Sequence, residues 1–171
     1  MTTMELHTPA AETLTLWTAL ISLSLYAAHV AILLRSRAEK NSLARTLYAA
    51  GYIVFLAHVA SAFHFYHHWS HEAALLETGR QTEEAFGFFW GGGIYFNYAF
   101  TVGWMLDALW WVSAPTSYRC RSPWLMTCWH AYFAFMAVNA TVVFGDGIAR
   151  WGGGAVATVL VVLWVRVRSR K

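Results

Sequence analysis

The chain has few charged residues: Asp, Glu, Lys and Arg make up 12% of its 171 residues. Soluble domains usually carry about 25% charged residues, so the composition does not predict a water-soluble surface. The two cysteines, Cys120 and Cys128, are too few for a disulfide framework and lack the spacing of a common metal site. A Ser–His–Asp order, a P-loop and a GxGxxG motif are missing, so hydrolase and nucleotide-dependent functions are excluded. Basic residues are not interleaved with aromatic ones on a polar stretch, so nucleic acid is not an expected partner.

Hydrophobic residues dominate instead. They make up 58% of the chain, aromatic residues make up 17%, ten residues are Trp, and the mean hydropathy is +0.42. A helix needs about 20 apolar residues to cross a bilayer, and Trp and Tyr favour the bilayer interfaces. The sequence therefore predicts an all-α integral membrane bundle of about five transmembrane helices, in one domain over residues 1–171. The predicted spans are approximately 13–34, 46–67, 92–112, 123–144 and 149–165.

The basic residues predict the orientation of these spans. The connection from Arg35 to Arg45, the connection 113–122 and the C-terminal tail carry ten of the twelve basic residues. Five spans place these three segments on one side, while the other side holds Arg80, Arg150 and seven of the nine acidic residues. Because cytoplasmic connections are enriched in Lys and Arg, the N-terminus is predicted outside and the C-terminus inside. We expect a multi-pass protein of the cell membrane. If the source is a bacterium, this is the inner membrane.

The longest connection between spans, from about His68 to Gly91, lies on the outer side in this topology. Apolar and acidic residues alternate along it at helical spacing, which predicts an amphipathic segment between the second and third spans. Its apolar residues include Leu75, Phe86 and Phe89, and its acidic residues include Glu72, Glu83 and Glu84. Three consecutive glycines, beginning at Gly91, are expected to end this segment.

Four histidines lie within eight residues at the outer end of the second span: His64, His67, His68 and His71. On a continuous helix they would share one face, with two pairs one turn apart, the spacing at which two imidazoles reach one metal ion. The nearby acids that can complete such a site are Glu72, Glu77, Glu83, Glu84 and Asp146. Imidazole and carboxylate ligands suit Fe, Cu, Zn or Ni. A metal site is therefore one hypothesis, and an interfacial or proton-handling cluster is the other.

A second group of ionisable residues lies deeper in the predicted spans. His29, Asp107 and His130 are each about six or seven residues from the inner end of a span, or about 10 Å from the cytoplasmic boundary at 1.5 Å per residue. Ionisable side chains in membranes face the bundle interior and pair with one another, so we expect Asp107 to bond His130 or His29. One hypothesis is that this polar pair fixes the packing of the helices. The other is that His29 and His130, at the same depth, are the two axial ligands of a b-type haem. His58, nearer the middle of the membrane, can link this group to the outer histidines.

Three functions remain open from the sequence. The first is a membrane metalloprotein that binds Fe, Cu or Zn at the outer histidines, for redox chemistry or metal handling. The second is a non-catalytic subunit or small transport bundle whose histidines handle protons, and the third is a b-type haem electron carrier. The sequence leaves open whether the chain is an enzyme. Its expected partners are the lipid bilayer, other membrane subunits or further copies of itself.

Overall fold

The computed structural model describes residues 9–35, 42–143, 147, 150–155 and 158. Every regular element within these residues is helical, and they contain no β-strand. The predicted all-α class is confirmed for this part of the chain.

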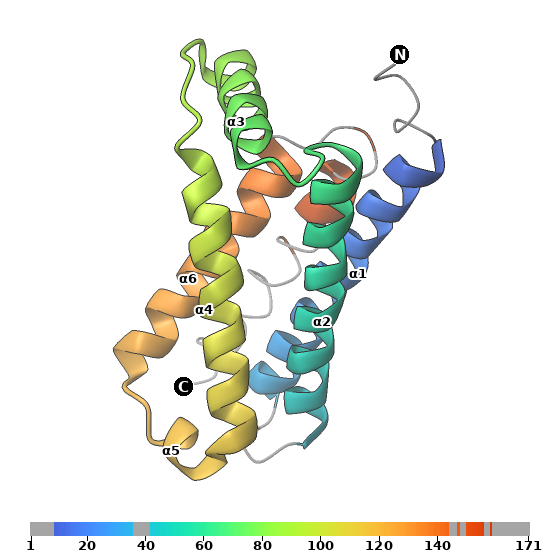
Figure 1. The fold of residues 1–171 in the computed structure, drawn as a ribbon. Coiled ribbons are helices and arrows are strands. Elements are labelled where there is room, and N and C mark those ends of the chain that lie inside the picture. Colours follow the sequence, from blue (N-terminus) through green and yellow to red (C-terminus); the bar gives the residue numbers. More distant parts are fainter. Residues whose placement is uncertain (1–8, 36–41, 144–146, 148–149, 156–157, 159–171) are drawn as a thin grey trace.

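Two long helices, α1 (Pro9–Arg35) and α2 (Ser42–Phe65), form an antiparallel pair. Their mutual contact is the most extensive between any two of the described elements (Figure 1). Both helices are long and apolar enough to cross a membrane. Hydroxyl side chains within them donate to the carbonyl four residues earlier, as Thr15 does at 2.9 Å and Ser61 at 2.8 Å. These bonds satisfy polar groups that an apolar surrounding cannot satisfy.

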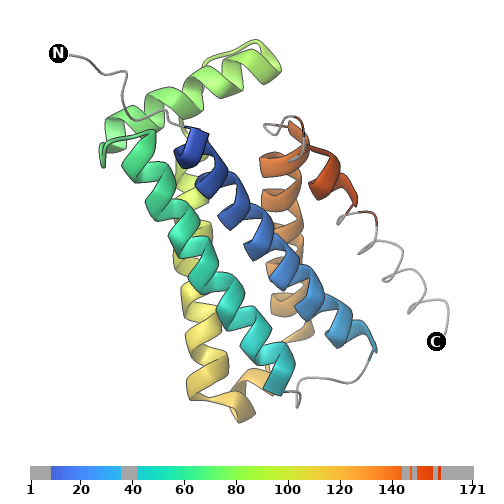
Figure 2. The ribbon, with the colours of Figure 1, turned by 90° about the vertical axis from the view of Figure 1, so that its right-hand side faces the viewer.

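A third helix, α3 (His71–Phe86), lies across the end of the bundle at which α1 begins (Figure 2). The side chain of Ser70 caps its N-terminus by accepting a hydrogen bond from the amide of Ala73 at 3.1 Å. Gly87, with a φ of 80°, ends the helix in the left-handed conformation that glycine adopts most easily. A helix therefore occupies the predicted amphipathic segment.

The remaining helices complete the bundle. α4 (Gly93–Ser113) runs back beside α2, and the short α5 (Pro115–Arg119) lies at the end opposite α3 (Figure 1). α6 (Pro123–Val138) then runs beside α4 and continues into a π-helical segment, η2 (Asn139–Val143). Of the fifth predicted span, residues 150–155 and 158 are helical, and the rest lies outside the described residues.

The histidine-rich segment does not continue α2, so the continuous helix on which the four histidines would share one face is not formed. α2 ends at Phe65, and His68 and Trp69 have φ values of 49° and 59° before α3 begins at His71. A right-handed helix requires a negative φ at every residue. The four histidines therefore do not share one face of a single helix.

The core consists mainly of aromatic side chains from α1, α2, α4, α5 and α6. Two glycines make room for indole rings in it. A Cβ at Gly51 would lie 3.3 Å from Cζ2 of Trp104, and a Cβ at Gly103 would lie 2.7 Å from Cη2 of Trp129. Both glycines therefore let a Trp side chain from a neighbouring helix approach closely.

Candidate functional site

The carboxylate of Asp107 on α4 is the acceptor at the centre of a partly buried hydrogen-bond network. Tyr48 of α2 donates its hydroxyl to Oδ2 at 2.7 Å, and Tyr118 of α5 donates to the same oxygen at 2.8 Å. The indole Nε1 of Trp129 on α6 donates to the hydroxyl oxygen of Tyr48 at 2.7 Å. The network thus joins four helices around one carboxylate, and its hydrogen bonds reinforce one another where water is scarce.

Packing around Tyr118 fixes the position of its hydroxyl. Its ring stacks on Trp111 with 4.8 Å between centroids and 9° between planes. The guanidinium carbon of Arg121 lies 3.6 Å from the centroid of the same ring, within cation–π distance. Arg121 therefore places a positive charge on the ring whose hydroxyl binds Asp107.

The two deep histidines lie beside this network. Nδ1 of His130 is 2.7 Å from the hydroxyl of Tyr26, and Nδ1 of His29 is 2.9 Å from the carbonyl oxygen of Ala44. Because a carbonyl only accepts, Nδ1 of His29 carries the proton and Nε2 of the neutral ring is an acceptor. The two imidazole centroids are 6.5 Å apart, and the His29 ring is 4.8 Å from that of Tyr48. The two histidines, the tyrosines and the carboxylate therefore form one cluster.

His29, Asp107 and His130 thus lie in one region, but the predicted bond between Asp107 and either histidine was wrong. Within the described part of the chain, both hydrogen bonds to the carboxylate come from tyrosines, Tyr48 and Tyr118. The chain has eight tyrosines, and nothing in their sequence spacing distinguishes these two. To identify these two tyrosines, one must know how each helix is rotated about its own axis, and a hydropathy pattern does not specify that rotation.

The packing around the two imidazoles gives the haem hypothesis no support. The rings of Tyr48, Trp111 and Tyr26 lie 4.8, 5.3 and 6.0 Å from the ring of His29 between centroids. A porphyrin held between two axial imidazoles needs a flat slot across the bundle. Aromatic side chains fill the space around His29 instead.

The outer histidines are spread over two helices and the turn between them. His64 lies in the last turn of α2, His67 and His68 lie in the turn, and His71 begins α3. Nδ1 of His67 is buried and has no hydrogen-bond partner within the described part of the chain. In the regions that the structure describes, no group of three or more His, Cys, Asp or Glu side chains is placed to hold one metal ion.

His71 is engaged by two tyrosines of α4. Its Nδ1 lies 2.9 Å from the hydroxyl of Tyr98, and its Nε2 lies 3.5 Å from that of Tyr95. The second distance is at the limit for a hydrogen bond. These contacts tie the start of α3 to α4 and occupy both nitrogens of this predicted metal ligand.

The acids on α3 are partly engaged by a single arginine. Arg80 donates two hydrogen bonds to Glu77, at 2.6 and 2.9 Å, and a third to Glu84. The hydrogen bonds from Arg80 lower the pKa of Glu77, and the two carboxylates raise the pKa of Arg80. Burial lowers the pKa of His67, and the negative charge of Glu77 opposes this effect. The last of the predicted acidic ligands, Asp146, lies outside the described residues.

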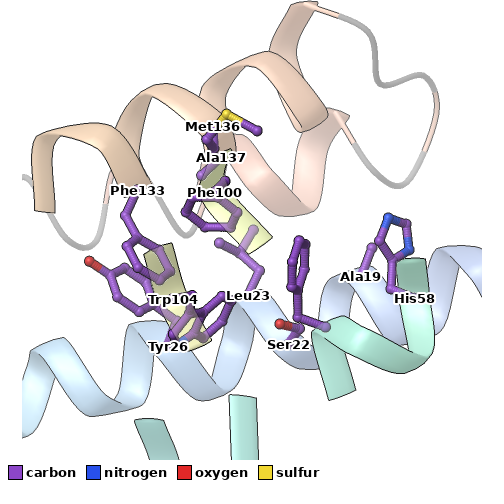
Figure 3. Close-up of a pocket in the computed structure, with 11 residues that line it drawn as sticks. Ala19, Ser22, Leu23, Tyr26, His58, Phe100, Trp104, Phe133, Met136 and Ala137 are labelled. Atoms are coloured by element: carbon purple, nitrogen blue, oxygen red, sulfur yellow. The ribbon is translucent and has the colours of Figure 1, made fainter. Parts of the chain in front are cut away.

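A cavity of about 100 Å³ lies among α1, α2, α4 and α6. Tyr26 lies toward one end of it and His58 toward the other, with Trp104 between them (Figure 3). Nδ1 of His58 donates to the carbonyl of Thr15 on α1 at 2.9 Å. The predicted link from His58 to the deep histidines is thus not a direct hydrogen bond, and the cavity separates His58 from Tyr26.

Comparison of the chain with known protein families, with curated proteins and with solved structures gives no match. Its function is therefore inferred from the helices, the cluster around Asp107 and the outer histidines.

Proposed function

We propose that the protein is a five-span membrane protein, with its N-terminus outside and its C-terminus in the cytoplasm, that handles protons through the cluster around Asp107. It acts as a small transport bundle or as a proton-handling subunit of a larger membrane complex. Its place is the cell membrane, which in a bacterium is the inner membrane.

Exposed apolar side chains support the membrane location. They occur on α1, α2, α4 and α6, and they include Trp17, Ile21, Ile53, Val102, Leu106, Leu109, Leu125 and Val138. Water-soluble monomers rarely expose apolar patches larger than a few hundred Å². Lipid chains are themselves apolar, so they can cover these side chains without a loss of free energy. The exposed apolar surface is therefore suited to a lipid bilayer.

The charges at the two ends of the bundle support the orientation. α3 carries Glu77 and Glu84 at one end, and Arg45, Arg119 and Arg121 belong to the segments at the other end (Figure 1). The positive-inside rule assigns the arginine end to the cytoplasm.

The observation that carries the proton-handling proposal is a carboxylate bonded by two tyrosine hydroxyls beside two imidazoles. Ionisable side chains within membrane bundles are costly and often mark proton paths. Hydroxyl and imidazole groups can each donate and accept, so a proton can pass between Tyr26 and His130 by an exchange of roles across their 2.7 Å contact. Arg121, on the ring of Tyr118, lies at the cytoplasmic end of the cluster in this orientation.

Proton flux into vesicles tests this proposal. The purified protein is reconstituted with a pH-sensitive dye inside, and a potassium gradient with valinomycin drives proton movement. We expect flux above that of empty vesicles, and a loss of about tenfold or more in Asp107→Asn, which keeps the shape of the side chain but removes its charge. The matched control is Glu84→Gln, which removes an exposed carboxylate on α3 and leaves flux unchanged. Flux equal to that of empty vesicles, or equal in wild type and Asp107→Asn, contradicts the proposal.

Metal binding at the outer histidines is a second candidate, supported by His67. Its Nδ1 is buried without a hydrogen-bond partner among the described residues, and Glu77, which Arg80 already bonds, acts on it electrostatically. A bound cation would give this nitrogen a partner, and imidazole with carboxylate suits Fe, Cu or Zn. Metal analysis of detergent-purified protein should then give a stoichiometric metal that is lost in His64→Ala and His67→Ala and kept in His58→Asn. A preparation without stoichiometric metal rules this candidate out.

A further inference from the structure

Tyr26 on α1 donates its hydroxyl proton to an imidazole inside the bundle. The residue is 5% exposed, and its hydroxyl oxygen lies 2.7 Å from Nδ1 of His130 on α6. Within the described part of the chain, this is the one hydrogen bond of the hydroxyl. If Nδ1 carried the proton, the phenol hydrogen would have no acceptor there, and buried polar groups are nearly always paired. Tyr26 is therefore the donor and Nδ1 the acceptor.

An imidazole acceptor makes a phenol easier to oxidise. A phenol that loses one electron becomes a strong acid, so its proton leaves at the same time. Nδ1 of His130 can take this proton along the existing bond, and imidazole is a stronger base than the carboxylate of Asp107, which accepts from two other tyrosines. Tyr98 also has an imidazole partner, His71, but that pair is exposed. Tyr26 therefore combines a proton acceptor with protection from water.

Aromatic rings connect Tyr26 with the surface of the bundle. Its ring stacks on Phe133, with 3.8 Å between centroids and 4° between planes, and lies 6.1 Å from the ring of Trp104 (Figure 3). The ring of Trp104 in turn lies 5.7 Å from that of Tyr52, which is only partly buried. Indole and phenol rings can lose an electron reversibly, and electrons pass readily between rings that are this close. An electron can therefore leave Tyr26 through Trp104 and Tyr52 for an oxidant in the lipid.

We propose that Tyr26 is a one-electron donor to lipid peroxyl radicals. Tyr26 loses its electron through Trp104 and gives its hydroxyl proton to Nδ1 of His130, which leaves a neutral tyrosyl radical beside an imidazolium. The electron reduces the peroxyl radical to a hydroperoxide anion, and this anion takes a proton from water to give the lipid hydroperoxide. The proposal rests on the proposed membrane location, because the oxidant forms in a bilayer, but it does not depend on proton flux.

Electron paramagnetic resonance on vesicles tests the proposal. The protein, labelled with ring-deuterated tyrosine, is reconstituted in dilinoleoyl phosphatidylcholine, and a lipid-soluble azo initiator generates peroxyl radicals in the presence of oxygen. Deuteration narrows the spectrum of a tyrosyl radical and so separates it from tryptophanyl and lipid radicals. We expect a tyrosyl radical in wild type and its loss in Tyr26→Phe, which keeps the ring and its stacking on Phe133.

Two further variants test the role of the imidazole. His130→Gln keeps an amide oxygen that can accept the hydrogen bond but does not take up the proton, so the radical should form more slowly by about tenfold or more. Tyr98→Phe removes the exposed hydroxyl that is paired with His71, and as the matched control it should leave the signal unchanged.

A wild-type protein without a tyrosyl radical, or a signal that persists in Tyr26→Phe, overturns the proposal, and neither result depends on whether His130→Gln folds. An equal rate of radical formation in wild type and His130→Gln overturns the transfer of the proton to the imidazole. Flotation of the vesicles after an alkaline wash tests the membrane location separately, and protein that is lost in this wash contradicts that location and this proposal with it. Absence of proton flux contradicts the transport proposal alone.

Discussion

At the scale of single residues, Tyr48 has two roles in the network around Asp107. Its hydroxyl donates to the carboxylate and accepts from the indole of Trp129, and the hydroxyl of Tyr118 donates to the same carboxylate. Loss of the Tyr48 hydroxyl therefore removes two hydrogen bonds and leaves an indole N–H without its acceptor.

We predict that Tyr48→Phe lowers the free energy of unfolding by about 2–3 kcal/mol and Tyr118→Phe by about 1 kcal/mol. Chemical unfolding in detergent, followed by tryptophan fluorescence, measures both values. Tyr52→Phe, on the same helix as Tyr48, is the control and should change the free energy by less than about 0.5 kcal/mol. A smaller loss for Tyr48→Phe than for Tyr118→Phe would show that the double role of Tyr48 does not stabilise the fold.

His67 gives the fold a dependence on pH. Burial holds its pKa below the ordinary value of 6.5, and unfolding restores that value. Between the folded pKa and about 6.5 the unfolded chain binds more protons, so stability falls as the pH falls through this window. An NMR titration of the His67 ring should therefore have a midpoint below 6.5 in the folded protein and a higher midpoint in denaturant.

Glu77→Gln tests the electrostatic part of this account. The negative charge of Glu77 raises the pKa of His67 against the effect of burial, so its removal should move the His67 midpoint to still lower pH. A midpoint that stays in place or rises would mean that Glu77 does not act on this imidazole.

At the scale of elements, the caps of α3 set where this helix begins and where the chain turns back toward α4. Gly87 ends α3 with a φ of 80°, a conformation that costs other residues about 1–2 kcal/mol. We predict that Gly87→Ala lowers the free energy of unfolding by about 1 kcal/mol and speeds hydrogen exchange in the last turn of α3. Gly154→Ala is the matched control, since it is helical, has no neighbour within 4 Å of an added Cβ and should be neutral or slightly stabilising. Equal effects of the two substitutions would contradict a special role for the backbone of Gly87.

Long helices could be predicted from the sequence, whereas the end of α2 could not. The apolar runs 13–34 and 46–67 correspond closely to α1 and α2, because hydropathy over 20 residues is a strong signal. The turn at His68 and Trp69 has no such signal, since the segment contains neither glycine nor proline and both residues adopt a φ that side chains usually avoid. That Asp107 lies in one region with His29 and His130 could be predicted from the same hydropathy count, whereas its tyrosine partners depend on helix rotation and could not.

At the scale of the whole molecule, the proposed orientation predicts which side of the membrane each end of the bundle faces. Cys120 is exposed at the end that carries α5, and α3 lies at the opposite end (Figure 1). In a Cys128→Ser background, a membrane-impermeant maleimide added to intact cells should leave Cys120 unmodified and should label it after the cells are opened. Glu84→Cys, introduced together with Cys120→Ser, should show the reverse, because α3 faces outward. Labelling of Cys120 in intact cells contradicts the orientation.

The unequal lengths of the helices have a consequence for the lipids around the protein. α1 has 27 residues, with a rise of about 40 Å, whereas α6 has 16 residues and continues through the five residues of η2, with a combined rise of about 30 Å. In the proposed membrane, whose hydrocarbon thickness is about 30 Å, α6 with η2 would match the bilayer and α1 would have to tilt. Acyl chain length then changes the angle between the α1–α2 pair and α6, and with it the distance between Tyr48 and Trp129. The lipid composition of the membrane would in this way adjust the hydrogen bonds around Asp107 without any ligand touching them.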